Sequence, residues 1–93
     1  MDRTEFQTAV RAEHYTEIST VIRPVGYELD EHQHSFDACG LITAGEITME
    51  VDGESRRYKV GDIFRMPAGV VHLESAGPQG VTYLVGRRER TAS

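Results

Sequence analysis

The chain has 93 residues, of which 39% are hydrophobic and 27% are charged, and its formal net charge is −5. A chain this short favours one domain over residues 1–93, because it has little core to divide. No apolar run approaches the roughly 18 residues that a membrane helix needs, and the negative charge argues against a surface that follows phosphates. We therefore expect a soluble protein without membrane or nucleic-acid partners.

The cysteine content indicates a reducing compartment. Cys39 is the single cysteine, so an internal disulfide is excluded. The first residues carry acidic side chains and no apolar segment of signal-peptide length, so we expect a cytoplasmic location. Cys39 itself lies in an apolar run and is expected to be buried and unreactive.

The first predicted element is a short helix at about residues 4–13. Asp2 or Thr4 can cap it, and Thr4 with Gln7 has the spacing of a capping box. From residue 15 the pattern changes, because YTEISTVI alternates and is rich in β-branched residues. This stretch predicts a first strand.

Every later periodic run is short and ends at a turn signal. In EITMEVDGESRRYKV, alternate residues from Ile47 to Val51 share one face, and Asp52 with Gly53 predicts a tight hairpin. The stretch AGPQG at 76–80 predicts a further turn before a closing strand, VTYLVG.

Many short antiparallel strands in a small chain predict an all-β protein. Closure into a barrel over about residues 15–86 would remove exposed strand edges. Residues 87–93 are expected to form a loose tail.

Three histidines carry the chemistry that the sequence predicts. In an extended strand, residues two apart point the same way, so His32 and His34 present both imidazoles on one face, about 7 Å apart along the chain. His72 follows a Pro-Ala-Gly turn that could return the chain to the same wall. Neutral imidazole suits zinc, copper, iron or nickel, and three such ligands leave positions open for water or substrate.

These residues resemble the two motifs of the cupin superfamily, Gly-x5-His-x-His-x3,4-Glu-x6-Gly and Gly-x5-Pro-x-Gly-x2-His-x3-Asn. The resemblance spans residues 26–76, and either motif alone would be less specific than the pair. The first motif is matched by Gly26, His32, His34 and Gly45, and the second by Gly61, Pro67, Gly69 and His72.

The resemblance implies a cupin-type jelly-roll barrel, or double-stranded β-helix, with one short N-terminal helix. It also implies one divalent transition metal (Fe, Zn, Ni, Cu or Mn) bound by His32, His34 and His72. The glutamate position of the first motif falls on Ala38, and the asparagine position of the second falls on Ala76. A fourth protein ligand is therefore expected to be missing.

Two neighbours of Ala38 are considered as substitutes for the absent glutamate. Strand parity places Asp37 on the face opposite His34, so it would need a bulge to reach the metal and could instead support a histidine. Cys39 would also need a bulge. Four apolar-strand residues could line the pocket but are core by default: Met49, Phe64, Met66 and Tyr83.

The predicted function is that of a metal-dependent enzyme, oxygenase-like or isomerase-like, acting on a small organic substrate. The alternative is a binding module that recognises a small ligand or uses the metal for stability alone. A limited core and the edge strand near the N-terminus favour a homodimer. Candidates for a general base are Tyr27, Glu28, Asp37 and Tyr83.

Overall fold

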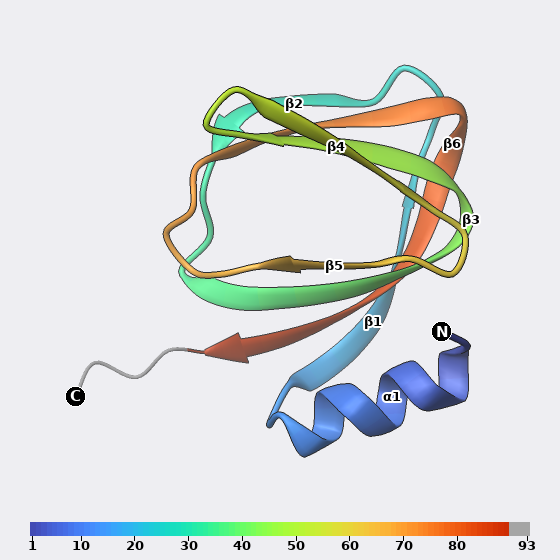
Figure 1. Cartoon of the computed structure of the whole chain (residues 1–93), viewed down its shortest axis with the longest axis vertical. Coiled ribbons are helices and arrows are strands. Elements are labelled where there is room, and N and C mark those ends of the chain that lie inside the picture. The colour runs from blue at the N-terminus through green and yellow to red at the C-terminus, as the bar shows by residue number, and fades with distance from the viewer. Residues whose placement is uncertain (90–93) are drawn as a thin grey trace.

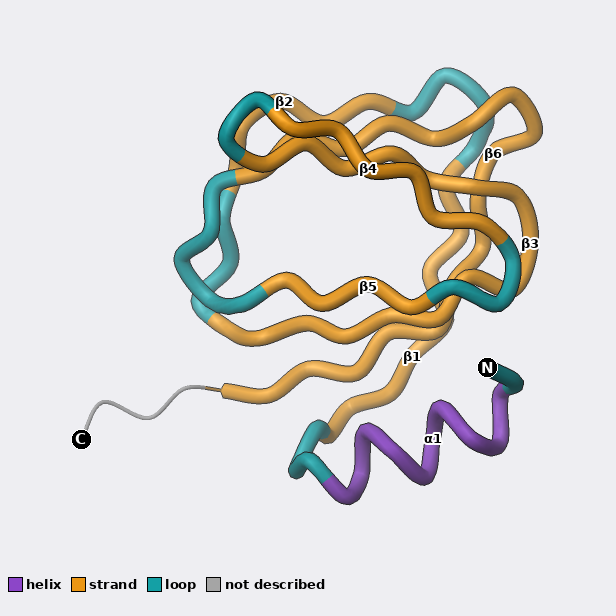
Figure 2. Tube along the Cα trace, viewed as in Figure 1, coloured by secondary structure: helices purple, strands orange, loops and turns teal. Residues whose placement is uncertain are grey.

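The computed structural model describes residues 1–89, which form one helix and six antiparallel strands (Figures 1 and 2). The all-β prediction with one N-terminal helix is therefore confirmed. The elements are α1 (Arg3–Ala12), β1 (Thr16–Arg23), β2 (Glu28–His32), β3 (Phe36–Val51), β4 (Glu54–Lys59), β5 (Ile63–Met66) and β6 (His72–Glu89).

Helix α1 begins one residue earlier than predicted, and the capping box predicted for Thr4 and Gln7 is wrong. Asp2 is the N-cap, and its Oδ1 accepts a 2.8 Å hydrogen bond from the backbone N–H of Glu5. Glu5 in turn accepts from the backbone N–H of Asp2 at 3.2 Å. Thr4 is already inside the first turn, so its hydroxyl cannot take the capping position.

Two long strands, β3 and β6, run side by side through both walls of the barrel. The first half of β3, residues 36–45, pairs with the last half of β6, residues 81–89. Strand β5 pairs with this part of β3, and β1 pairs with this part of β6. The other halves of β3 and β6, residues 46–51 and 72–76, pair with each other and with β4 and β2. Figure 1 shows the two resulting layers, with α1 outside the layer that contains β1 and β5.

Glycines allow both long strands to turn the corner between the layers. Gly45 and Gly80 have φ values of 69° and 75°, in the region that favours glycine, and a Cβ on Gly45 would collide with the carbonyl of Gly80. The turn predicted at 76–80 is therefore wrong, since β6 continues through this stretch. The glycines and the proline of this stretch mark a bend inside the strand and do not end it.

The hairpin predicted at Asp52 and Gly53 is confirmed. Both residues have positive φ, and Val51 pairs with Glu54 across the two-residue turn. The predicted loose tail is partly wrong, because residues 87–89 belong to β6 and Arg87 pairs with both neighbouring strands. Residues 90–93 lie outside the described part of the chain.

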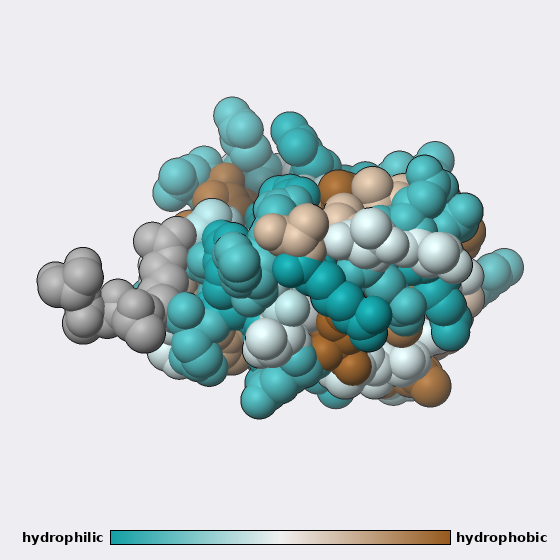
Figure 3. Space-filling view, turned by 90° about the horizontal axis from the view of Figure 1, so that it is seen from below, coloured by the Kyte–Doolittle hydropathy of each residue, from teal (hydrophilic) through white to brown (hydrophobic). Residues whose placement is uncertain are grey.

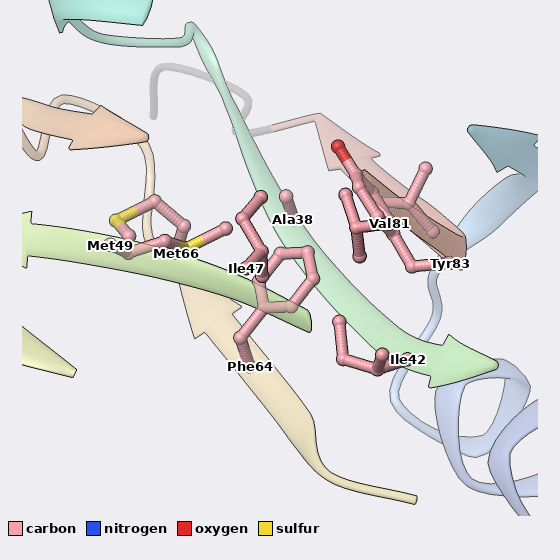
Figure 4. Close-up of a cluster of buried hydrophobic side chains, with 9 residues drawn as sticks. Ala38, Ile42, Ile47, Met49, Phe64, Met66, Val81 and Tyr83 are labelled. Atoms are coloured by element: carbon pink, nitrogen blue, oxygen red, sulfur yellow. The ribbon is translucent and has the colours of Figure 1, made fainter. Parts of the chain in front are cut away.

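The core has two compartments separated by the β1–β6–β3–β5 layer. Outside it, α1 covers a cluster that includes Cys39, which is buried as predicted. Inside the barrel, Met49 and Met66 lie next to each other at one end of the second cluster, and Val81 and Tyr83 lie at the other (Figure 4). The interior cluster forms the floor and walls of the site described below.

The outer surface on the helix side is mainly hydrophilic, with scattered hydrophobic residues (Figure 3). Among residues 1–89, no helix is long and apolar enough to span a membrane.

Candidate metal centre

The three predicted histidines lie together at one end of the barrel interior. His32 is the last residue of β2 and pairs directly with His72, the first residue of β6. His34 lies just beyond β2, in the link to β3. The ring centroid of His72 is 4.0 Å from that of His32 and 5.3 Å from that of His34. The spatial convergence expected from the two motifs is therefore observed.

A fourth donor, missed in the sequence, completes the cluster. Glu74 lies two residues after His72 on β6, so both side chains point to the same face of the strand. One ligand atom from each of the three histidines and Glu74 lies within 4.8 Å of the others. A fourth potential donor is therefore present where none was expected, because a carboxylate reaches the cluster from the strand that carries the second motif.

Two of the histidines have a defined tautomer. Nδ1 of His32 lies 3.1 Å from the carbonyl oxygen of Asp30, and Nδ1 of His72 lies 3.0 Å from that of Val70. A carbonyl oxygen can only accept, so each Nδ1 carries the proton and donates it. In the neutral rings, Nε2 therefore presents a lone pair. Such an outer hydrogen bond is the usual support of a metal-bound histidine.

The Nε2 atoms of both rings face the same carboxylate oxygen. Oε2 of Glu74 is 3.0 Å from Nε2 of His72 and 3.3 Å from Nε2 of His32. Within residues 1–89, Nε2 of His32 is buried and has no hydrogen-bond partner. Neutral imidazole nitrogens and a carboxylate oxygen are all acceptors, so at these distances they repel unless a cation lies between them.

A divalent metal fits this donor set better than extra protons do. A proton on Nε2 of His72 would bond to Glu74 at 3.0 Å, but it would leave the buried Nε2 of His32 without a hydrogen-bond partner. One metal ion would satisfy every lone pair at once. Three imidazoles and one carboxylate are donors that zinc, iron, copper, nickel and manganese accept.

The surroundings of His34 also favour an uncharged ring. Burial lowers the pKa of His34, and the neighbouring His32 and His72 lower it further. Its ring stacks on Phe36 with centroids 4.8 Å apart and an interplanar angle of 20°. A neutral imidazole is the form that binds metal, so the site is ready for it near neutral pH.

Asp37 supports the site from outside and does not join it. It is buried on the opposite face of β3, as strand parity predicts, and its Oδ2 accepts from Nη2 of Arg88 at 2.9 Å. Its Oδ1 accepts at 2.8 Å from the backbone N–H of Ala68, in the turn that leads to His72. Cys39 is likewise on the outer face, in the cluster beneath α1. Neither residue is among the four clustered donors.

The donor cluster opens into a cavity of about 100 Å³ inside the barrel. The four residues considered for the pocket wall belong to the buried core, as expected by default, and also line this cavity: Met49, Phe64, Met66 and Tyr83. Ala38, at the position of the family's glutamate, also faces the cavity. Its small side chain leaves space where a carboxylate would otherwise lie.

The candidates for a general base divide clearly. Glu28 is exposed on β2 and does not line this cavity, while Asp37 lies on the outer face of β3, so both are excluded by position. Tyr27 and Tyr83 do line the cavity. Burial raises the pKa of Tyr83 to about 12 and also raises that of Tyr27, so both hydroxyls are protonated at neutral pH and act as donors.

A family model described as a cupin domain matches residues 19–85. No curated protein matches the sequence. Among solved structures, DMSP lyase DddQ from Ruegeria pomeroyi DSS-3 has 27% sequence identity and a TM-score of 0.70, covering 82% of this chain and 39% of that one. KdgF from a Halomonas species also has 27% identity, with a TM-score of 0.62 and coverage of 82% and 75%.

A cupin-like protein from Thermotoga maritima msb8 has 25% identity and a TM-score of 0.64, covering 77% of this chain and 55% of that one. The present chain therefore spans little more than half of that relative and less than half of DddQ. These similarities agree with the barrel topology and with the two sequence motifs.

Proposed function

Because this chain belongs to the cupin family and its motif histidines converge on a carboxylate, we propose that it is a metal-dependent enzyme acting on a small organic substrate. One observation carries the proposal: the Nε2 atoms of His72 and His32 face the same oxygen of Glu74 at 3.0 and 3.3 Å inside the barrel. The proposed ligands of one divalent transition metal are His32, His34, His72 and Glu74.

When bound, the metal would supply Lewis acid chemistry, or redox chemistry if it is iron, copper or manganese. The residues of this chain would contribute position and protons. Tyr27 donates from its hydroxyl to Oε1 of Glu74 at 3.5 Å, which orients the carboxylate that faces the histidines. The protonated hydroxyl of Tyr83 is available in the same cavity to donate to an oxygen atom of a substrate.

The apolar wall would limit the access of water to the reacting centre. Met49, Phe64 and Met66 are each at least nine-tenths buried, and all three line the cavity. A volume of about 100 Å³ suits a small organic molecule. We propose oxygenase-like or isomerase-like chemistry, and the similarity to a protein described as a DMSP lyase adds elimination to the reaction classes to test.

The alternative is a non-enzymatic module that binds a small ligand or uses the metal for stability. The two functions differ in whether an exchangeable ligand reaches the metal. If water binds directly to the metal and exchanges with bulk solvent, the protein loaded with Mn(II) should raise the relaxation rate of water protons well above that of metal-free protein. Fast exchange supports the enzyme, whereas relaxation no greater than that of metal-free protein supports a closed structural site.

The proposal is tested by elemental analysis of protein purified without an affinity tag, followed by reconstitution with each candidate metal. We expect one ion per chain and affinity that falls sharply in His72→Ala. His14→Ala is the matched control, because His14 follows α1 and is not part of the cluster. A panel of small organic compounds is then followed by NMR for metal-dependent turnover. Equal metal content in both variants would refute the site.

A further inference from the structure

The wall of the metal cavity is asymmetric in charge. Two arginines line it, Arg23 at the end of β1 and Arg87 near the end of β6, and both are also exposed to solvent. Glu74 is the single carboxylate among the lining residues. The remaining wall is largely apolar and comes from Val21, Leu29, Phe36, Ala38, Met49, Phe64, Met66 and Val85.

Both arginines are held against aromatic rings that line the same cavity. Cζ of Arg23 lies 4.9 Å from the ring centroid of Tyr27, and Cζ of Arg87 lies 4.6 Å from that of Phe36. Stacking occupies the face of a guanidinium group and leaves its in-plane N–H donors available. The rings therefore restrict the rotamers of both arginines. Arg23 also hydrogen-bonds to the hydroxyls of Tyr27 and Tyr83, which uses part of its set of five donors and leaves the rest for an anion.

Among residues 1–89, neither arginine forms an ion pair. Within the described residues 1–89, no carboxylate oxygen lies within 4.0 Å of a side-chain nitrogen of Arg23 or Arg87. The arginines on the outer face of the barrel are different, since Arg65 pairs with Glu13 and Arg88 pairs with Asp37. The two guanidinium charges exceed the one carboxylate in the cavity by a single charge, and a divalent metal would raise the excess to three.

We infer that the substrate is a small organic carboxylate whose anionic end is recognised by Arg23 and Arg87 and whose short apolar part lies against the barrel wall. This inference rests on the proposed function for the metal and adds the substrate class. A planar guanidinium group matches a carboxylate through two parallel hydrogen bonds. The apolar wall favours such a ligand over inorganic phosphate, which has no apolar part to bury.

The test measures binding of butyrate, butyramide and inorganic phosphate to the zinc-loaded full chain by calorimetry. Butyrate and butyramide have nearly the same shape and differ in charge. We expect butyrate to bind at least tenfold more tightly than butyramide and more tightly than phosphate. Equal affinity for butyrate and butyramide, or tighter binding of phosphate, would overturn the inference.

Variants locate the effect within the cavity. Arg23→Gln and Arg87→Gln should each weaken butyrate binding at least fivefold and leave butyramide binding nearly unchanged, while Arg56→Gln should change neither. Arg56 is exposed on the edge strand β4 and does not line the metal cavity. Circular dichroism verifies that each variant is folded, and Arg23→Lys should recover part of the affinity. A loss in Arg56→Gln as large as in the cavity variants would show a general surface effect and refute the inference.

Metal content, measured on the same samples, separates this inference from the proposed function. If one ion binds per chain and butyrate is not preferred, the substrate class is wrong and the metal site stands. If no metal binds but butyrate is preferred through Arg23 and Arg87, the metal-dependent function is wrong and anion recognition stands.

Discussion

Nε2 of His72 lies 3.0 Å from Oε2 of Glu74, two positions further along the same strand. The same oxygen lies 3.3 Å from Nε2 of His32, on the neighbouring strand. The ladder between β2 and β6 pairs the two histidines directly, and the period of a strand brings the carboxylate to the same face. Three donors are thus placed by one pair of strands, and the link after β2 adds His34.

Replacing Glu74 by Gln should weaken metal binding on the order of 100-fold while leaving the fold intact. The amide has nearly the same size but lacks the negative charge and is a poor metal ligand. Competition with a chelating dye measures the affinity. Glu28→Gln is the control, since that carboxylate is exposed and outside the cavity. An unchanged affinity in Glu74→Gln would remove the carboxylate from the ligand set.

Replacing Asp37 by Asn should lower the stability of the fold and leave metal binding unchanged, the opposite of Glu74→Gln. The buried carboxylate accepts from Arg88 and from the backbone N–H of Ala68, so its loss should lower the melting temperature. Metal stoichiometry should remain one ion per chain, because Asp37 lies on the outer face of β3. Calorimetric melting combined with elemental analysis tests both parts. Loss of the metal with an unchanged melting temperature would show that Asp37 is a ligand after all.

Removing the metal should destabilise the fold. A ligand present at 100 times its dissociation constant stabilises the native state by about 2.7 kcal/mol. For a domain of this size that corresponds to a rise in melting temperature of roughly 10–20 °C. Thermal unfolding followed by circular dichroism, with zinc and then with excess EDTA, measures the difference. Coincident unfolding curves would mean that the native chain does not bind the ion.

The alkaline titration should identify the buried hydroxyl in the cavity. Burial raises the pKa of Tyr83 from its ordinary value of 10.0 to about 12. Between pH 10 and pH 12 the unfolded chain loses this proton and the folded chain keeps it, so the free energy of unfolding should fall as the pH rises through this range. Tyr83→Phe should lose this contribution and the last phenolate absorbance step. A wild-type titration complete near pH 10 would contradict the burial.

Replacing Gly40 by Ala should cost about 1–3 kcal/mol through overpacking. Gly40 pairs with Phe64 across the strands, and an added Cβ would collide with the Phe64 ring, which also lines the metal cavity. The companion variant is Phe64→Leu, which removes the ring. Denaturant unfolding of the two single variants and the double variant gives the coupling. If the double variant loses the sum of the single effects, the two positions are independent and the packing argument is wrong.

The homodimer expected from the sequence remains a prediction. Strand β1 is at the edge of its layer, and Ile22 on it is 70% exposed. Light scattering should give twice the chain mass of 10.4 kDa, and Ile22→Lys should lower it. Val60→Lys is the control, because Val60 is a similarly exposed valine, at 63%, in the turn between β4 and β5 and not on β1. A monomer at micromolar concentration would contradict the prediction.

The histidine set could be predicted from the sequence because motif spacing and strand parity act over a few residues. The link that carries His34 and the turn before His72 are joined by a hydrogen bond from the backbone N–H of Gly69 to the carbonyl of His34. Glu74 could have been found by the same parity argument, since His72-Leu73-Glu74 repeats the period of His32-Gln33-His34. The two motifs do not indicate it, because residue 74 is one of the three unspecified positions between His72 and Ala76.

Other features depend on contacts that local patterns do not contain. Gly45 and Gly80 look like the ends of strands in the sequence, yet they allow two strands to bend around the barrel and remain paired. The end of β6 looks polar and loose, but Arg87 is stacked on Phe36 and Arg88 reaches Asp37. The stacked arginines in the cavity likewise result from the closure of the barrel.

The central claim is that His32, His34, His72 and Glu74 bind one metal ion, and anomalous diffraction from zinc-loaded crystals at the zinc absorption edge tests it most directly. The account predicts one strong anomalous peak per chain, about 2.0–2.2 Å from a nitrogen of each histidine and from an oxygen of Glu74. A peak elsewhere on the chain, or a cavity without one in protein that contains stoichiometric zinc, would contradict it.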